Sequence, residues 1–208
     1  MVASRVKARI PARNNPSIKA EIYMFPELYI LRHGETEWNL ANRMQGELNS
    51  PLTDKGKAQA AHQGAILQNC DLAGFDFFSS PQGRAVETAG IALGAIADAV
   101  RTDDRLREIG VGDWSGKFRD ELPSVPGADP FMSHYEIAPN GEGFARLEAR
   151  AREFLADLAG PAVLVTHGIT SRILRTIVAG EGAVAERTVH GGQGCVYHLK
   201  EGVQKLLE

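Results

Sequence analysis

The chain has 208 residues, of which 43% are hydrophobic, with 23 Lys and Arg against 26 Asp and Glu. This size and balance describe a soluble globular chain with a sizeable core, and they exclude a disordered, fibrous or small disulfide-stapled protein. No apolar run approaches the roughly 20 residues that cross a bilayer. Cys70 and Cys195 are far apart in the sequence and belong to no Cys/His cluster. We therefore expect no membrane span, no disulfide framework, no zinc site, and a reducing, cytoplasmic location.

Residues 1–26 differ in charge from the rest of the chain. Five basic residues and no acid fall within residues 1–20, which leaves 18 basic residues against 26 acidic ones in the remainder. An acidic body argues against a nucleic-acid binder, whose positive surface should lie on the folded domain. We predict a flexible basic N-terminal extension over residues 1–26. An organellar presequence, or a start at the internal Met24, is the alternative.

From residue 27 onward, short apolar runs alternate with longer helical patterns. This alternation predicts a single α/β domain over residues 27–208 with a largely parallel sheet. Residues 28–31 are apolar at every position, which indicates a central strand that is covered on both faces. Thr53 precedes a helical pattern that runs to about residue 69, and its hydroxyl is suited to cap that helix.

A second strand, a second helix and a third strand are predicted between residues 75 and 101. Residues 75–78 read as a second strand, and Pro81 stands where a helix begins. Helical spacing predicts that the buried face of this helix consists of Ala85, Val86, Ala89 and Leu93. A third strand is expected around residues 99–101.

The second half of the chain begins with glycine- and proline-rich residues, for which we expect a cap of loops and short helices around 110–140. An amphipathic helix follows over 142–158, then a β-branched strand over 162–166, a short helix over 169–178 and a late strand over 195–199. The apolar stripe of the first of these helices contains Phe144, Leu147, Ala151, Phe154, Leu155 and Leu158.

Two histidines stand in the same local context. His33 and His167 each follow a predicted strand, and each precedes a glycine, Gly34 or Gly168, that lets the backbone approach a ligand closely. The carboxyl ends of parallel strands line one crevice, so both imidazoles should emerge there, together with Arg84 and an acid after the third strand. The residues expected at this edge are Arg32, His33, Arg84, Glu108 and His167.

These residue types suit phosphoryl transfer. Two arginines can bind phosphate oxygens bidentately and neutralise them without a metal. One histidine can attack phosphorus as a nucleophile, and the second adds positive charge if it is protonated. A carboxylic acid can protonate the departing alkoxide and then activate water. Taken singly, each residue is more often a solvated charge or an ordinary hydrogen-bonding group, so only the combination points to this chemistry.

The motifs resemble those of the histidine phosphatase superfamily, also called the phosphoglycerate mutase-like family. The resemblance spans about residues 27–200 in the order of the family. It rests on LRHGETEWN at 31–39, RMQG at 43–46, SPLT at 50–53, SSP at 79–81 with RA and ETA up to residue 89, LRE at 106–108, GDWSG at 112–116, NGE at 140–142 and VTHG at 165–168.

The resemblance implies a three-layer α/β/α sandwich with a mostly parallel central sheet. It also implies a phosphohistidine on His33, proton transfer by Glu108, no metal and no cofactor. Its phosphate and substrate contacts would be Arg32, His33, Asn39, Gln45, Gly46, Arg84, His167 and Gly168. Thr36 and Glu35 are open between helix capping and phosphate contact. Trp38 is expected to pack, and the remaining histidines, His62, His134, His190 and His198, match no catalytic position.

Phosphatases and mutases of this family share the pocket and differ in the cap. Mutases carry Arg-His-Tyr after the catalytic acid and a basic insertion, whereas IGVGDWSG follows Glu108 here. Between Glu108 and Glu142 only Lys117 and Arg119 are basic, against five acids, which disfavours a second anionic group on the substrate. We expect a phosphatase acting on a small phosphomonoester. A cofactor-dependent phosphoglycerate mutase and a non-catalytic phosphate-binding module are the alternatives, and monomer and homodimer both stay open.

Overall fold

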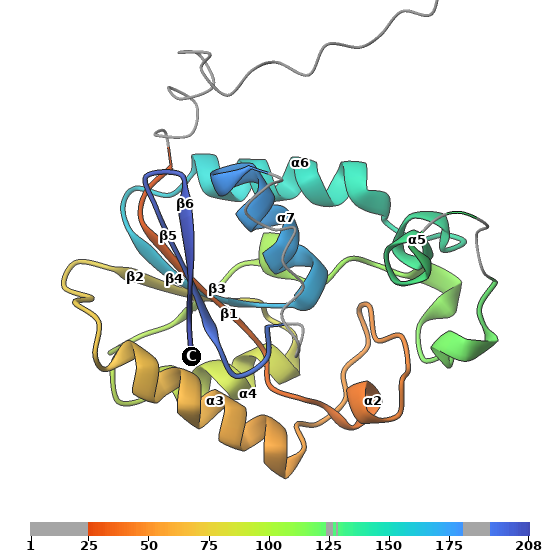
Figure 1. The fold of residues 1–208 in the computed structure, drawn as a ribbon, viewed down its shortest axis with the longest axis horizontal. Helices are drawn as coiled ribbons and strands as arrows, with labels where there is room; N and C mark the ends of the chain where they lie inside the picture. The colour runs from red at the N-terminus through yellow and green to blue at the C-terminus, as the bar shows by residue number, and fades with distance from the viewer. Residues whose placement is uncertain (1–24, 124–126, 128, 181–191) are drawn as a thin grey trace, which may run out of the picture.

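The computed structural model describes residues 25–123, 127, 129–180 and 192–208. Almost all of the predicted N-terminal extension, together with His190, lies outside these described residues. Within them, one sheet has helices on both faces (Figure 1), which confirms the predicted three-layer α/β/α sandwich. No helix in the described ranges has the length and apolar character needed to cross a membrane.

Six strands form the sheet in the order β3-β2-β4-β1-β5-β6. They are β1 Leu28–Arg32, β2 Asp76–Ser79, β3 Arg101–Thr102, β4 Ala162–Thr166, β5 Val196–Lys200 and β6 Val203–Leu207. The first four strands in this order pair in parallel, and β5 and β6 add an antiparallel edge. Glu201 and Gly202, at φ of 52° and 71°, form the tight turn between β5 and β6, because a two-residue hairpin loop of this kind needs positive φ.

The two central strands, β1 and β4, lie side by side, and His33 and His167 directly follow their carboxyl ends. Their register runs from Leu28 opposite Ala162 to Arg32 opposite Thr166. The His33 backbone N–H continues this ladder by donating to the Thr166 carbonyl at 3.0 Å. The two strands are buried almost throughout, as expected for parallel strands covered on both faces.

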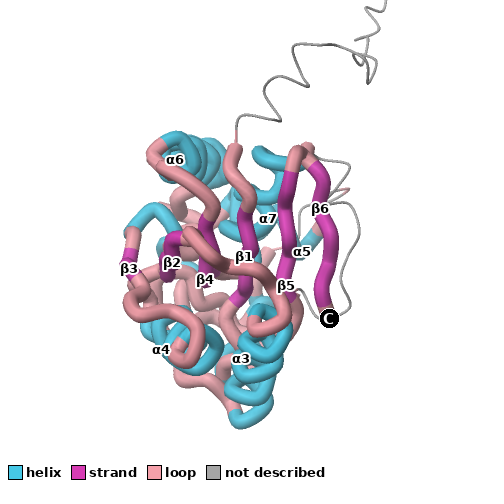
Figure 2. Tube along the Cα trace, turned by 90° about the vertical axis from the view of Figure 1, so that its left-hand side faces the viewer, coloured by secondary structure: helices cyan, strands magenta, loops and turns pink. Residues whose placement is uncertain are grey.

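Two pairs of helices form the outer layers. The helices α3 Asp54–Leu67 and α4 Gly83–Leu93 cover one face, and α6 Gly143–Ala156 and α7 Gly168–Ala179 cover the other (Figures 1 and 2). Side chains alternate along β1, so that Tyr29 and Leu31 face α3 and α4 while Leu28 and Ile30 face α6 and α7. Each outer layer therefore buries its own apolar cluster against the sheet.

Most predicted elements are confirmed within one or two residues, and the differences have local causes. Thr53 caps α3 as predicted, accepting from the Gly56 N–H at 3.0 Å. Val86, predicted to be buried, is 44% exposed, because α4 turns Arg84 and Thr88 inward toward the carboxyl ends of the strands instead. The third strand is a two-residue edge at Arg101–Thr102, and β6 was not predicted.

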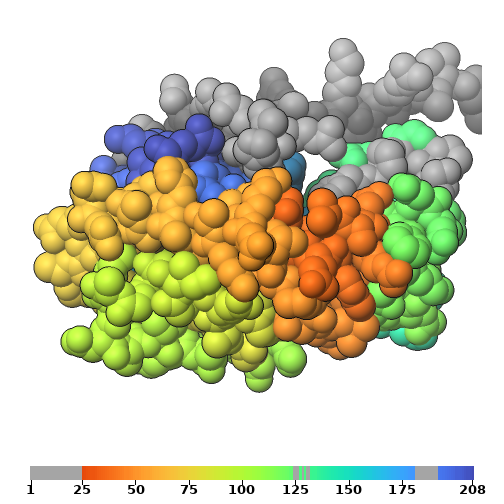
Figure 3. All heavy atoms as spheres, turned by 90° about the horizontal axis from the view of Figure 1, so that it is seen from below, coloured from red at the N-terminus to blue at the C-terminus, as the bar shows by residue number. Residues whose placement is uncertain are grey.

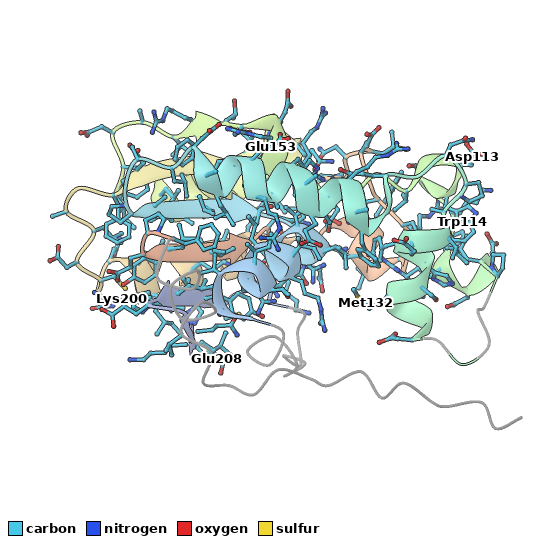
Figure 4. All side chains as sticks on the ribbon, turned by 90° about the horizontal axis from the view of Figure 1, so that it is seen from above. Asp113, Trp114, Met132, Glu153, Lys200 and Glu208 are labelled. Carbon is cyan, nitrogen blue, oxygen red and sulfur yellow. The ribbon has the colours of Figure 1, made fainter. Side chains whose placement is uncertain are left out.

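Residues 110–140 contain short helices that pack beyond the carboxyl ends of the strands, next to α2 Glu37–Leu40 (Figure 1). These helices are η2 Gly112–Trp114, η3 Arg119–Glu121 and α5 Pro130–Ile137. Figure 4 shows the labelled Asp113, Trp114 and Met132 at this end of the molecule, opposite Lys200 and Glu208. The segment has its own core around Met44, Trp114, Tyr135 and Leu147.

The segment is attached to the sandwich by backbone contacts. Residues 42–44 pair with 117–119, including a Met44 N–H to Lys117 carbonyl bond of 2.9 Å. Figure 3 shows these two segments, orange and green, side by side. At the other end, Glu142 accepts from the Gly110 N–H at 3.1 Å and donates its own backbone N–H to the Gly110 carbonyl at 2.8 Å. The residues that follow Glu108 are therefore held in place at both ends.

Candidate active site

Three groups meet at the carboxyl ends of the central strands. His33 follows β1, His167 follows β4, and Arg84 lies in the first turn of α4. The Arg84 Nε lies 3.3 Å from His33 Nε2 and 3.2 Å from His167 Nδ1, and the two imidazole centroids are 5.1 Å apart. The structure thus brings together three of the residues that the sequence predicts for one site.

The contacts of His33 define which ring nitrogen carries the hydrogen. Its Nδ1 lies 2.7 Å from the Gly34 carbonyl oxygen, which can only accept, so Nδ1 carries the hydrogen. Nε2 then holds a lone pair and accepts from Arg84. Burial, and after it the charges of Arg84 and Arg32, lower the pKa of His33 well below its ordinary value of 6.5. The ring is therefore neutral at pH 7, with a nucleophilic nitrogen facing the guanidinium.

His167 is also held in its neutral form. Its Nδ1 accepts from Arg84, so its Nε2 donates to the Ser80 hydroxyl oxygen, 2.7 Å away. Burial, followed by the charges of Arg84 and the proximity of His33, lowers the pKa of His167 well below 6.5. Because His167 is neutral, the positive charge of the site comes from the guanidinium groups of Arg32 and Arg84 and not from this imidazole.

Arg84 is almost completely buried and is fixed by two backbone carbonyls. Its Nη1 donates to Leu48 at 2.7 Å and its Nη2 to Gly46 at 3.0 Å. Burial lowers the pKa of Arg84 to about 10, with Glu108 raising it and Arg32 lowering it further. The side chain therefore keeps its charge at neutral pH. The guanidinium group is held in one orientation because Nη1 and Nη2 each donate to a backbone carbonyl.

Arg32, the last residue of β1, brings a second guanidinium to the same site. Burial lowers its pKa, an effect that the nearby Glu108 opposes. Gly168 makes room for this side chain, because a Cβ at residue 168 would lie 3.3 Å from Arg32 Cζ. A buried and a half-buried guanidinium thus lie beside two neutral imidazoles, and such an arrangement attracts an anion.

Glu108 lies at the N-terminus of α7. Its carboxylate accepts from the backbone N–H groups of Ile169 and Thr170, each at 3.1 Å. The Thr170 hydroxyl lies 3.1 Å from the same carboxylate. The charge of the Glu108 carboxylate raises the pKa values of Arg32 and Arg84. Glu108 therefore belongs to the same electrostatic network, although it forms no direct bond to either imidazole.

The predicted substrate contacts differ in what the structure shows. Asn39 forms a capping box with Thr36, and its Oδ1 also accepts from Gln193 Nε2 at 3.0 Å, so its oxygen serves local structure. Gln45 is buried, and its side-chain Oε1 has no hydrogen-bond partner among the described residues. The Gly46 carbonyl accepts from Arg84 and from Gln82.

Several other sequence expectations concern residues around the site. Thr36 is the N-cap of α2, and Glu35 forms an ion pair with Lys55 at 2.9 Å, so both have structural partners. Trp38 packs against Gly116. Of the remaining histidines that the structure describes, His62 is exposed, and His134 and His198 contact groups away from the site. The Pro123 carbonyl contacts His134, and Glu27 contacts His198.

Sequence reasoning missed residues that hold the groups of the candidate site in place. Ser80 contacts His167, and Thr88 links the Gly34 N–H to the Arg84 carbonyl at 3.1 and 2.8 Å. Gln82 bonds to the backbone of Glu108 at 2.8 Å. Ser80 could have been found, because it follows a strand end as His33 and His167 do. The roles of Thr88 and Gln82 depend on contacts between distant segments and leave no local signal.

Comparisons with known proteins show what the sequence and the fold are similar to. A sequence model of the histidine phosphatase superfamily (branch 1) matches residues 28–205. Two relatives named "Probable phosphoglycerate mutase GpmB" align over 77% of this chain and 78% of their own length. The protein from Enterobacter sp. (strain 638) is 31% identical, and the one from Serratia proteamaculans (strain 568) is 34% identical.

Solved structures share the fold over most of the chain. An Escherichia coli str. K-12 substr. MG1655 structure described as "a putative alpha-ribazole-5'-P phosphatase" has a TM-score of 0.70 at 26% identity, covering 88% of this chain and 94% of that one. Bacillus stearothermophilus YhfR has a TM-score of 0.65 at 32% identity, covering 88% and 96%. These likenesses confirm the predicted fold class.

Proposed function

Because the chain belongs to the histidine phosphatase superfamily, we propose that it is a metal-independent phosphatase that hydrolyses a small phosphomonoester through a phosphohistidine on His33. One observation carries the proposal. The His33 Nε2 lone pair faces the Arg84 guanidinium, so the nucleophile and the phosphate-binding cation already occupy one buried site. Members of this superfamily are phosphatases and mutases, and the choice between them depends on the rest of the pocket.

In the first step, the His33 Nε2 lone pair attacks phosphorus and the bond between phosphorus and the leaving oxygen breaks. Glu108, in its protonated form, gives its proton to that oxygen, so an alcohol departs and a carboxylate remains. Arg32 and Arg84 stabilise the charge on the three remaining phosphate oxygens. The substrate phosphate takes over the Arg84 Nε donor that His33 and His167 share.

In the second step, the Glu108 carboxylate accepts a proton from water as the water oxygen attacks phosphorus. The bond between phosphorus and Nε2 breaks, and its electron pair returns to the imidazole. His33 is thereby restored as the neutral tautomer that donates from Nδ1 to the Gly34 carbonyl. Glu108 is protonated again and ready for another cycle.

The positive charge for this reaction is supplied by side chains in the proposal. Arg32 and Arg84 contribute two guanidinium groups. In the part of the chain that the structure describes, no three or more His, Cys, Asp and Glu side chains are grouped closely enough to hold a metal ion. We therefore expect phosphate release to continue in EDTA.

The segment 110–140 is the proposed cap and the proposed origin of substrate selectivity. The acids Asp113, Asp120 and Glu136 in this segment are exposed. A negative rim disfavours a substrate with a second phosphate, which supports hydrolysis of a monoester with one anionic group. The partner class proposed here is thus a small phosphorylated metabolite, with no nucleic-acid partner.

A mutase is the second candidate, and one feature of the cap favours it. The Arg119 guanidinium turns inward, donates to the Tyr135 hydroxyl and lies 5.2 Å from the centre of that ring. Its charge reaches Arg32, whose pKa it lowers, although burial is the larger cause. Arg119 is thus a cation near the proposed phosphate site, and it is suited to bind a second anionic group on the substrate. The two relatives named as probable phosphoglycerate mutases also favour this candidate.

The test is phosphate release in EDTA from a panel of monoesters, with 3-phosphoglycerate and its bisphosphate included. Wild type should release phosphate from one class of monoester and His33→Ala should release none. Exchange of phosphate between phosphoglycerates without net release would identify a mutase. Phosphate binding without either reaction would identify a non-catalytic binding module.

A further inference from the structure

Gln82 connects the two sides of the pocket with one side-chain amide. It lies between β2 and α4 and is only 5% exposed. Its Oε1 accepts the Glu108 backbone N–H at 2.8 Å, and its Nε2 donates to the Gly46 carbonyl at 2.8 Å. The Gly46 carbonyl is also the acceptor of Arg84 Nη2. The side-chain amide of Gln82 thus connects Glu108, the proposed proton donor, to the Gly46 carbonyl, which helps to fix Arg84.

The helix that begins beside Gln82 does not use this side chain. Gln82 is the N-cap of α4, yet it makes no side-chain capping bond. Asn49 Oδ1 accepts the Arg84 N–H at 2.8 Å instead, and Ser80 Oγ accepts the Gln82 N–H at 3.3 Å. Because glutamine is also outside the group of favoured N-cap residues, helix formation does not account for this residue. Its amide serves the pocket alone.

We propose that Gln82 is a positioning residue that sets the place of Glu108 relative to the phosphate-binding arginine; this rests on the proposed function. The carboxylate of Glu108 is held on one side by the N-terminus of α7. Gln82 holds its backbone on the other side, so the carboxyl group has two fixed supports. Proton transfer in the transition state requires the donor within hydrogen-bond reach of the leaving oxygen, and a misplacement of about 1 Å can reduce the rate about 100-fold.

The direct test is Gln82→Met, which keeps the length of the side chain and removes both hydrogen bonds. Turnover of an alkyl phosphate should fall by about 10- to 100-fold, because an alkoxide leaves only when it is protonated. Turnover of p-nitrophenyl phosphate should fall by less than about threefold, because that leaving group needs little protonation. KM for both substrates should change little, since the phosphate contacts remain.

Gln63→Met is the matched control for loss of stability. Gln63 is also buried and donates to two backbone carbonyls, those of Arg32 at 3.0 Å and Cys195 at 2.9 Å. Its replacement should lower the melting temperature by a similar amount, since each variant loses two buried hydrogen bonds. Any effect of Gln63→Met on turnover should be equal for alkyl and aryl phosphates, because this residue does not touch Glu108.

Hydrogen exchange of the Glu108 amide gives a readout that does not need activity. This exchange should accelerate more than about tenfold in Gln82→Met, while the Asp103 amide, bonded to the Ser79 carbonyl, should not change. Gln82→Glu keeps an acceptor for the Glu108 N–H and loses the donor to the Gly46 carbonyl, so it separates the two hydrogen bonds. It should retain the protection of the Glu108 amide, and it also serves if Gln82→Met fails to fold.

Equal losses for alkyl and aryl phosphates, or an unchanged Glu108 amide in Gln82→Met, would overturn the proposal. A wild-type protein that hydrolyses neither substrate would contradict the proposed function instead. The exchange measurement would then still decide whether Gln82 holds the Glu108 backbone. The two failures are therefore distinguishable.

Discussion

Arg84 Nε donates toward His33 Nε2 across 3.3 Å, so the guanidinium faces the lone pair that must reach phosphorus. The same N–H is shared with His167 Nδ1 at 3.2 Å. A phosphate dianion entering the site replaces this weak shared contact by charge-assisted hydrogen bonds, which are stronger. In this account, binding of the phosphate therefore also frees the His33 Nε2 lone pair from its hydrogen bond to Arg84.

Arg84→Lys tests the importance of the guanidinium fork. Lysine keeps the charge but cannot contact the Gly46 carbonyl, the Leu48 carbonyl and both imidazoles together. Loss of a charge-assisted hydrogen bond costs about 1.5 to 3 kcal/mol, so kcat/KM should fall by about 10- to 150-fold. Steady-state kinetics on p-nitrophenyl phosphate measures this loss. A variant within threefold of wild type would show that charge alone is sufficient.

The pH dependence of activity follows from the neutral His33. Burial and two arginines hold its pKa well below 6.5, so the nucleophile stays unprotonated as the pH falls through that value. The acid limb of kcat/KM, measured with p-nitrophenyl phosphate, should therefore lie below pH 6.5. An acid limb at or above pH 6.5 would contradict the lowered pKa of His33.

The same histidines make folding stability depend on pH. His33 and His167 resist protonation in the folded state, while in the unfolded chain they titrate near 6.5. Below that pH the unfolded state binds more protons, so the free energy of unfolding should decrease as the pH falls from 6.5 toward the folded-state values. Above pH 7 these two residues should leave the free energy of unfolding unchanged.

Urea unfolding between pH 8 and pH 5 measures this slope. His33→Asn should reduce it, whereas His62→Asn should not, because His62 is exposed. Equal slopes in wild type and His33→Asn would mean that His33 is not held neutral by the fold.

Glu108→Gln tests the proton donor. The amide oxygen can accept from only one of the Ile169 and Thr170 N–H groups, because these donate to different oxygens of Glu108 and the amide NH2 cannot accept. The variant therefore keeps the size of the side chain and part of its anchoring, while the transferable proton is lost. Turnover of alkyl phosphates should fall about 100-fold or more, and that of aryl phosphates much less. Parallel rate measurements on both substrates decide the point. Equal losses would assign the acid role to another group.

The parts of the fold that the sequence predicts well depend on local signals. The apolar strands that become β1 and β4, and the Thr53 cap of α3, are encoded in a few consecutive residues, and the structure confirms them. Val86 was predicted wrongly because helical periodicity assumes an apolar buried face. In α4 that face contains Arg84 and Thr88, which the site and not the core requires.

The candidate site divides in the same way. The strand-end rule predicts that His33, Arg84 and His167 lie together, because each stands next to a glycine, a turn or a helix start that is visible in the sequence. The contact of Gln82 with Glu108 joins residues 26 positions apart, and that of Ser80 with His167 joins residues 87 apart. The position of Ser80 after a strand is visible in the sequence, but the partner that it contacts, like the partner of Gln82, depends on the register of the strands and leaves no local pattern.

The most direct test of the central claim is to trap the phosphoenzyme. Wild type is mixed with a labelled phosphomonoester and quenched in alkali, in which phosphohistidine survives, and the labelled peptide is identified by mass spectrometry. The account predicts label on His33 in wild type, none in His33→Ala, and accumulation in Glu108→Gln with an aryl substrate. Label on another residue, or steady phosphate release with no labelled protein at any time, would contradict it.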